Sequence, residues 1–137
     1  MKPGVVIAQF LFHHLVDETK LIYALQTLGR SMNPGGRLLI TEVKLPGAIE
    51  PIQSIFLPIM QRFLSNLKKP QLRFFSVSSL TKLLDNAGFT ISSLHTFSVS
   101  GKVHPAPVIC PRISMPGKLY PFKMMFVEAI PNTSNCS

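Results

Sequence analysis

The chain has 137 residues, enough for one domain, and 46% of them are hydrophobic while only 15% are charged. This balance excludes an intrinsically disordered chain, because enough apolar surface is present to form a packed core. Lysine and arginine outnumber the acidic residues and give a formal net charge of +8. The basic residues are scattered, and the densest cluster is Lys68, Lys69 and Arg73. We therefore interpret the charge as an ordinary basic surface and expect no nucleic-acid partner.

Cysteine usage and hydropathy exclude two further classes of protein. Cys110 and Cys136 lie far apart and form no Cys-x-x-Cys or Cys/His spacing, so we expect neither a metal site nor a disulfide framework. A reducing, cytoplasmic location suits this pattern. No stretch reaches the ~18 uninterrupted apolar residues of a membrane-spanning helix.

Residues 5–43 predict a strand, a helix and a second strand. Val5–Phe12 is a continuous apolar run, which is typical of a strand buried on both faces. Asp17–Asn33 has leucines at helical spacing, and Asp17 is a good N-cap. Pro34-Gly35-Gly36 then ends the helix, and Arg37–Val43 forms the next strand. This order predicts a βαβ unit, whose two strands are parallel.

The middle of the chain predicts two more helices. A broad apolar stripe at helical spacing runs from Ile52 to Leu67, and Pro58 should kink or divide it. A clearer helix begins at Ser78 or Ser79 and ends at Gly88.

The last third predicts two strands, Phe89–Val99 and Phe122–Ile130, which can form an antiparallel pair. The proline-rich segment Ser100–Pro121 between them predicts a long loop. We expect an α/β domain over residues 1–130 and a disordered tail over residues 131–137.

Three stretches resemble class I S-adenosylmethionine-dependent methyltransferases of the small-molecule type. VVIAQFLFHHLVDETK is similar to the family's fourth strand and the start of the following helix. LGRSMNPGGRLLITEV is similar to its turn into strand five, and FFSVSSLTKLLDNAGFTISSL to the helix before strand six. YPFKMMFVEAI fits the family's seventh strand. The resemblance implies a partial Rossmann-like sheet of strands four to seven, the last pair antiparallel, with flanking helices.

One part of the family pattern is missing. The family binds its cofactor with a Gly-x-Gly-x-Gly turn after strand one, and no Gly-x-Gly triplet occurs in this sequence. The resemblance therefore covers the C-terminal half of the domain. It implies S-adenosylmethionine as cofactor and a small-molecule methyl acceptor. The alternative is a non-catalytic methyltransferase-like remnant or interaction module.

Candidate site residues follow from the resemblance, because ligands of open α/β sheets bind at the carboxyl ends of the strands. It implies that Gln9 and Phe10, at the end of the family's strand four, contact the cofactor. His13 or His14 could act as a general base, or both could merely line the start of a helix. Glu42, at the end of strand five, could bind the acceptor or lie at the sheet rim without a chemical role.

Two surfaces could bind partners. The apolar stripe from Ile52 to Leu67 could cover an apolar acceptor or pack on the core. Together with the basic cluster it could instead lie on a membrane surface, and we favour this third alternative least. The family's sheet order implies that Val5–Phe12 exposes an edge that could pair with a strand of another chain.

Overall fold

The fold is a mixed four-stranded sheet with helices on one face. The structure is a computed structural model that describes residues 1–53, 55, 59, 73–103, 114–119 and 122–132. The sheet order is β1-β2-β6-β3, and the strands are β1 (Val5–Gln9), β2 (Arg37–Lys44), β3 (Phe89–Phe97) and β6 (Lys123–Pro131). β1 is parallel to β2, whereas β6 is antiparallel to both β2 and β3. The chain therefore has an α/β fold, as the sequence predicts.

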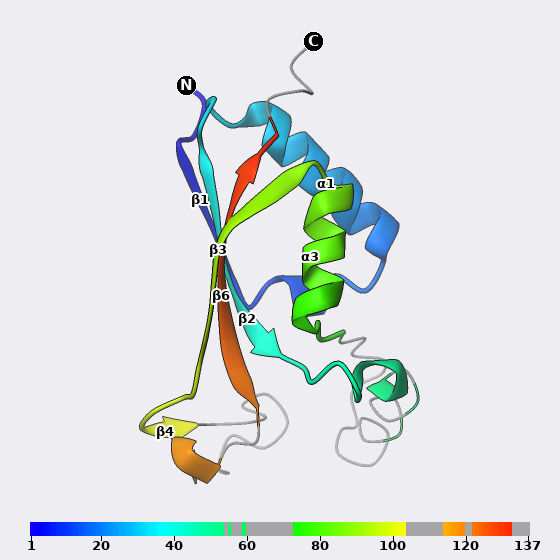
Figure 1. The fold of residues 1–137 in the computed structure, drawn as a ribbon, viewed down its shortest axis with the longest axis vertical. Coiled ribbons are helices and arrows are strands. Elements are labelled where there is room, and N and C mark those ends of the chain that lie inside the picture. The colour runs from blue at the N-terminus through cyan, green and yellow to red at the C-terminus, as the bar shows by residue number, and fades with distance from the viewer. Residues whose placement is uncertain (54, 56–58, 60–72, 104–113, 120–121, 133–137) are drawn as a thin grey trace.

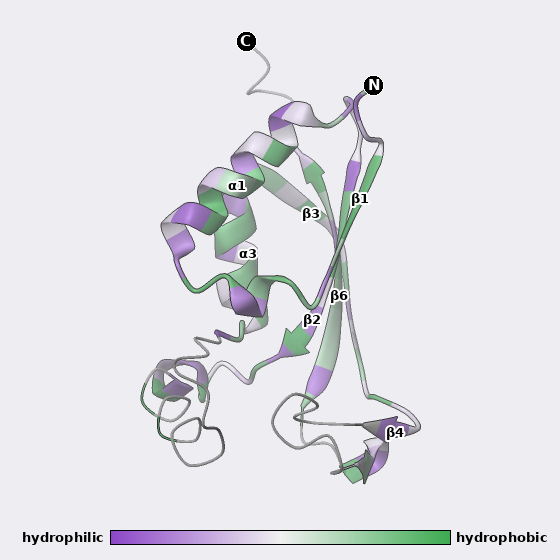
Figure 2. Ribbon diagram, turned by 180° about the vertical axis from the view of Figure 1, so that it is seen from behind, coloured by the Kyte–Doolittle hydropathy of each residue, from purple (hydrophilic) through white to green (hydrophobic). Residues whose placement is uncertain are grey.

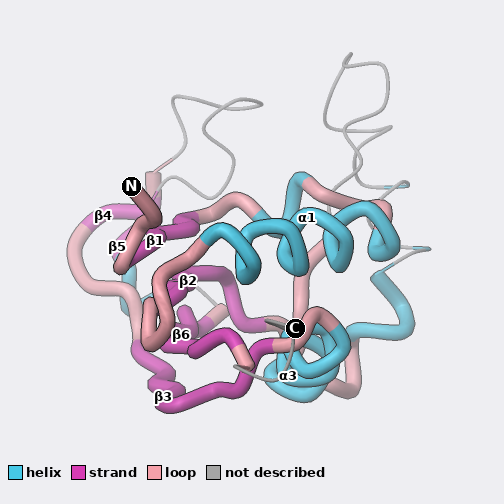
Figure 3. Tube along the Cα trace, turned by 90° about the horizontal axis from the view of Figure 1, so that it is seen from above, coloured by secondary structure: helices cyan, strands magenta, loops and turns pink. Residues whose placement is uncertain are grey.

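Two helices, α1 (Glu18–Ser31) and α3 (Val77–Asn86), cover the same face of this sheet (Figures 1 and 2). Seen from above, α1 lies beside β1 and β2, while α3 lies nearer to β3 and β6 (Figure 3). The core forms between the helices and the sheet, and it excludes water from the apolar side chains. Its fully buried members include Leu21 of α1, Leu38 and Ile40 of β2, Leu80 and Leu84 of α3, and Met125 and Val127 of β6.

The predicted N-cap of α1 is confirmed, and that of α3 is corrected. Asp17 accepts a hydrogen bond from the Lys20 backbone N–H at 3.2 Å. The N-cap of α3 is Ser76, whose hydroxyl accepts from the Ser79 backbone N–H. Sequence pattern alone does not separate several serines in one run. The buried position of Ser76 selects it, because a buried hydroxyl needs a partner.

The predicted glycine stop is confirmed for α3, where Gly88 follows the C-cap Ala87, whereas α1 ends earlier, at Ser31 with Met32 as its C-cap. Gly35, in the turn before β2, has a φ of +74°, and Gly88, after α3, has a φ of +81°. Both values lie in the left-handed region that glycine adopts without a steric penalty. At Gly36 a β-carbon would stand 2.9 Å from the carbonyl oxygen of Asn33, so only glycine fits there. The Pro-Gly-Gly turn therefore has a backbone reason for each of its glycines.

The first strand is shorter and more exposed than predicted. It ends at Gln9, and a 3-10 turn, η1 (Phe12–His14), follows. Val5 is 55% exposed and Ile7 is 70% exposed, so the prediction of a strand buried on both faces is wrong. The physical reason is that, within the described residues, no helix covers the second face of the sheet (Figure 2).

The predicted loop and tail are each partly ordered. Lys102–Val103 (β4) and Met115–Pro116 (β5) form a separate two-stranded antiparallel sheet. Residue 131 ends β6, and the Asn132 N–H donates to the carbonyl oxygen of Gly88 at 2.8 Å. Residues 133–137 lie outside the described residues, as does most of the stripe from Ile52 to Leu67 with Pro58. Among the described helices, none is long and apolar enough to cross a membrane.

Candidate active site

The site begins with a carboxylate on the core side of β2. Leu38, Ile40 and Glu42 alternate along this strand and are all buried, because side chains two residues apart point to the same face. Glu42 retains only 1% of its accessible surface. A carboxylate taken out of water at this position requires hydrogen-bond donors close by.

The 3-10 turn η1, which follows β1, supplies both donors. The Phe12 backbone N–H donates to Glu42 Oε1 at 2.7 Å, and His13 Nδ1 lies 2.9 Å from Glu42 Oε2. The His13 side chain is 13% exposed, so its contact with Glu42 is largely shielded from solvent. A carboxylate can only accept, and Nδ1 therefore carries the hydrogen. This leaves Nε2 as the second ring nitrogen, free of Glu42, to exchange a proton with a ligand.

The backbone between β1 and η1 makes this approach possible. The Phe10 N–H donates to the Thr41 carbonyl oxygen at 2.9 Å, which continues the pairing with β2 for one residue. Phe10 then has a φ of 50°, a left-handed conformation that is uncommon for an aromatic residue. The chain turns there, and the buried ring of Phe12 anchors η1 in the core. Strained backbone of this kind is often retained at functional sites.

Two rings contact the His13 imidazole. The ring of Phe74 stacks on it with centroids 5.6 Å apart and an interplanar angle of 17°. The ring of the exposed His14 lies 4.0 Å away, tilted by 43°. His13 thus has a carboxylate at one nitrogen and an aromatic ring over one face, whereas His14 lies at the surface.

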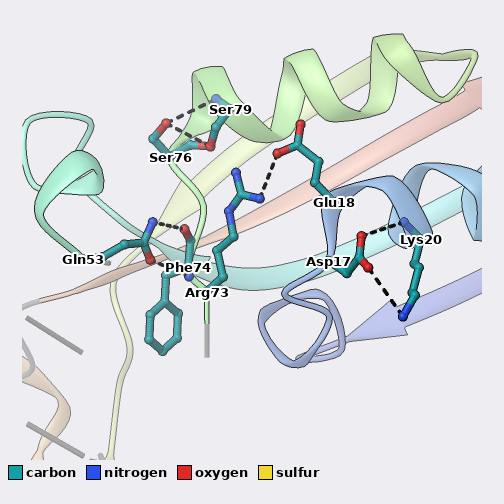
Figure 4. Close-up of polar contacts among 8 residues, drawn as sticks. All are labelled: Asp17, Glu18, Lys20, Gln53, Arg73, Phe74, Ser76 and Ser79. Carbon is teal, nitrogen blue, oxygen red and sulfur yellow. Dashed lines mark hydrogen bonds and ion pairs between the residues drawn. The ribbon is translucent and has the colours of Figure 1, made fainter. Parts of the chain in front are cut away.

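The segment that carries Phe74 is fixed from several sides (Figure 4). The Arg73 N–H donates to the His13 carbonyl oxygen at 2.9 Å, and its guanidinium binds Glu18 of α1 at 2.8 Å. Gln53, directly after the 3-10 turn η2 (Glu50–Ile52), forms two hydrogen bonds with the backbone of Phe74. The Leu45 N–H donates to the carbonyl oxygen of Phe75 at the end of β2. Arg73 is therefore engaged in internal contacts.

The structure brings some of the predicted site residues together. Glu42 and His13 form one hydrogen-bonded pair, so Glu42 is directed at His13 and the η1 backbone, away from the sheet rim. Gln9 and Phe10 lie next to this pair in the chain and are exposed, Phe10 to 41%. Within the described residues, no group of three or more potential metal ligands gathers.

Two features of the site were not predicted from the sequence: the burial of Glu42 and the contributions of Gln53 and Phe74. The alternation of Leu38, Ile40 and Glu42 could have shown that Glu42 faces the core and needs a partner. Gln53 and Phe74 carry no signal in the sequence, because they are 21 residues apart and their contacts, Gln53 with Phe74 and Phe74 with His13, are tertiary.

The chain resembles known proteins in fold and not in sequence. No family model matches the chain, and no curated protein matches it by sequence. Solved structures do match. An S-adenosylmethionine-dependent methyltransferase from Methanosarcina mazei aligns with 94% of this chain at 15% identity, with a TM-score of 0.59. CalO1, a methyltransferase in calicheamicin biosynthesis solved with S-adenosylhomocysteine bound, aligns with 93% at 15% identity and a TM-score of 0.54.

A third similar structure differs in its chemistry. It is described as a pericyclic reaction enzyme and aligns with 96% of this chain at 10% identity, with a TM-score of 0.60. The chain spans 59% of the first of these structures, 30% of the second and 27% of the third. At these identities the likeness shows the fold alone, which is that of S-adenosylmethionine-dependent methyltransferases. The fold does not decide which reaction takes place on it.

Proposed function

We propose that this chain carries the acceptor-activating half of a methyltransferase site, with His13 as general base. The observation that carries the proposal is the buried Glu42 carboxylate, which binds the Phe12 N–H and His13 Nδ1 at the carboxyl ends of two parallel strands. Burial of a carboxylate is costly unless its partners are fixed. Here the partner is an imidazole whose other nitrogen is left for a ligand.

The proposed reaction transfers a methyl group to a hydroxyl of a small molecule. S-adenosylmethionine, when bound, supplies an electrophilic methyl group on its sulfonium. Nε2 of His13 would take the proton of the acceptor hydroxyl, so that its oxygen could receive the methyl group that the bound cofactor would supply. Glu42 keeps the hydrogen on Nδ1 and stabilises the imidazolium. A base is useful only for an acceptor that must lose a proton, which favours an alcohol or phenol.

The cofactor would bind partly against Gln9 and Phe10. In this proposal β1, β2, β3 and β6 correspond to the family's strands four, five, six and seven. The buried carboxylate of Glu42, which lies at this end of the sheet, already accepts hydrogen bonds from the Phe12 N–H and from His13. It is therefore not available to bind the cofactor. Gln9 and Phe10 fit one wall of a cofactor site and do not enclose it.

The test is methyl transfer from radiolabelled S-adenosylmethionine to a panel of small phenols and alcohols, with the whole chain. His13→Ala should lower the rate by ~10²–10⁴-fold, which is the range of general-base catalysis. His14→Ala is the matched control and should change the rate by less than about threefold. Equal effects of the two substitutions, or none, would contradict the role of His13.

The alternative function is a non-catalytic module that retains the fold. It is favoured by the missing Gly-x-Gly triplet. Calorimetric titration of the purified chain with S-adenosylhomocysteine separates the two. Saturable binding at micromolar concentration supports the enzyme, and absence of heat up to millimolar concentration supports the module.

We also propose that β1 pairs with a strand of another polypeptide. The Arg37 N–H donates to the Gly4 carbonyl oxygen and the Phe10 N–H donates to Thr41, so even-numbered residues of β1 face β2. The backbone groups of Val5, Ile7 and Gln9 face away from it. This edge carries no charged residue, and charge is a common protection of exposed edges. Together with the open sheet face, it offers a place for additional strands.

A further inference from the structure

We propose that Gln53 and Phe74 position the His13 imidazole. The inference rests on the proposed role of His13 as base and adds the residues that orient it. Neither Gln53 nor Phe74 is assigned to the reaction by sequence pattern. Their contribution follows from three sets of contacts.

The first set joins Gln53 to Phe74. Gln53 Nε2 donates to the Phe74 carbonyl oxygen at 2.9 Å, and the Phe74 N–H donates to Gln53 Oε1 at 2.8 Å. One amide side chain thus satisfies both backbone groups of one residue (Figure 4). An amide suits this pairing, since it presents a donor and an acceptor on one planar group.

The second set fixes the residues on either side of Phe74. Arg73 is tied to the His13 carbonyl oxygen by its backbone and to Glu18 by its guanidinium. Phe75 is 1% exposed and bridges to Lys44 at the end of β2. With both neighbours and its own backbone held, Phe74 has little freedom to move its ring away from His13.

The third set acts on the imidazole. Glu42 binds one edge of the ring at Nδ1, and Phe74 lies over one face at 5.6 Å. A hydrogen bond at one atom leaves the ring free to tilt about that bond. A stacked ring at 17° fixes the plane, so the two contacts together set the direction of Nε2.

The spectroscopic test uses the whole chain and needs no substrate. An aromatic ring stacked on an imidazole shifts its carbon-bound protons upfield. In Phe74→Leu, these His13 signals should move downfield, and Phe97→Leu, the same change at an exposed phenylalanine of β3, should leave them unchanged. Gln53→Ala should broaden or shift the same signals. Gln26→Ala, the control, removes a long 3.5 Å contact to the Asn86 carbonyl oxygen and should leave these signals unchanged.

A double substitution separates positioning from a general loss of stability. If Gln53 acts through Phe74, Gln53→Ala adds nothing to the His13 shift once Phe74→Leu is present. Additive shifts, or unchanged His13 signals in both single variants with native amide spectra, would overturn the inference. Gln53→Glu keeps the acceptor and loses the donor, so it should resemble Gln53→Ala.

A kinetic test asks whether the contacts of Gln53 and Phe74 affect the proposed reaction. Phe74→Leu and Gln53→Ala should lower kcat by about tenfold with little change in KM for the acceptor, because misorientation affects the transition state more than binding. A rise in KM at unchanged kcat would contradict positioning. If the His13 signals respond as expected but His13→Ala does not reduce transfer, the positioning contacts stand and the role of His13 as base fails.

Discussion

At the scale of single residues, the physics of the site is that of one buried carboxylate. Glu42 occupies a core position of β2 next to Leu38 and Ile40, where a leucine or isoleucine would pack without any need for partners. The free-energy cost of burying this carboxylate is offset by hydrogen bonds with the Phe12 N–H and His13, both of which lie on η1. A position that sacrifices apolar packing for a paired imidazole is typical of chemistry rather than of stability.

Substitution of Glu42 separates its structural role from its chemical one. Glu42→Gln can still accept from the Phe12 N–H, but its amide NH₂ would donate to Nδ1 and move the ring hydrogen to Nε2. We expect methyl transfer to fall by ~10²–10⁴-fold while the fold is kept, because the base then has the wrong tautomer. Glu42→Ala leaves the Phe12 N–H without its partner and should cost about 1–3 kcal/mol in the free energy of unfolding. Steady-state kinetics and urea unfolding measure the two effects; a fully active Glu42→Gln variant would rule out the base.

At the scale of elements, patterns of residues close together in the sequence predict much of the fold. The leucine spacing of α1, its Asp17 cap and the Gly35-Gly36 turn were readable because each depends on residues within a few positions. The cap of α3 was misplaced by two residues or more, since three serines lie close together and only burial distinguishes Ser76. The exposure of β1 was not readable, because a continuous apolar run does not reveal what covers it.

The cap of α3 gives a stability prediction. The Ser76 hydroxyl accepts from the Ser79 N–H and is buried, so Ser76→Ala should lower the free energy of unfolding by ~1 kcal/mol. Ser78→Ala is the control, because the exposed Ser78 caps no backbone group in the described structure. Chemical unfolding followed by circular dichroism measures both. Equal losses would contradict the placement of the cap at Ser76.

The cap of α1 gives a pH prediction. The hydrogen bond from the Lys20 backbone N–H, together with the Lys20 charge, holds the pKa of the Asp17 carboxyl below its ordinary value. Stability from this cap is therefore present above the unfolded pKa and is lost as pH falls through the folded pKa. Asp17→Asn keeps a cap without the titration. Between about pH 6 and about pH 3, the urea midpoint of the native chain should fall more than that of Asp17→Asn, and identical slopes would contradict the effect.

At the scale of the whole molecule, the described residues leave one face of the sheet covered by helices and the other face open. Ile7, Leu39 and Glu128 form neighbouring positions across β1, β2 and β6 on the open face, where Arg37 and Glu128 form an ion pair of 3.0 Å. On this face Glu128 thus lies between the apolar Leu39 of β2 and the polar Ser93 of β3. The sequence predicts Glu42 and His13 as candidate site residues, but neither their pairing nor the contact of His13 with Phe74, since the three residues come from separate segments.

The open edge predicts self-association or pairing. We expect the purified chain to associate with rising concentration in sedimentation velocity, and Ile7→Lys to reduce this by placing a charge on the edge strand. Tyr23→Lys is a matched control, because Tyr23 on α1 is also 70% exposed, and it should leave association unchanged. A monodisperse native monomer at high concentration would count against the edge as a pairing surface.

The central claim is that Glu42 fixes His13 with its hydrogen on Nδ1 and leaves Nε2 available as a base. Nitrogen-15 NMR of the histidine rings in the whole chain tests it most directly, since the two nitrogens of a neutral imidazole differ widely in chemical shift. For His13 in the native chain we expect a protonated Nδ1 and an unprotonated Nε2. In Glu42→Gln we expect a protonated Nε2 and an unprotonated Nδ1. An Nε2-protonated His13 in the native chain, or the same tautomer in both proteins, would contradict it.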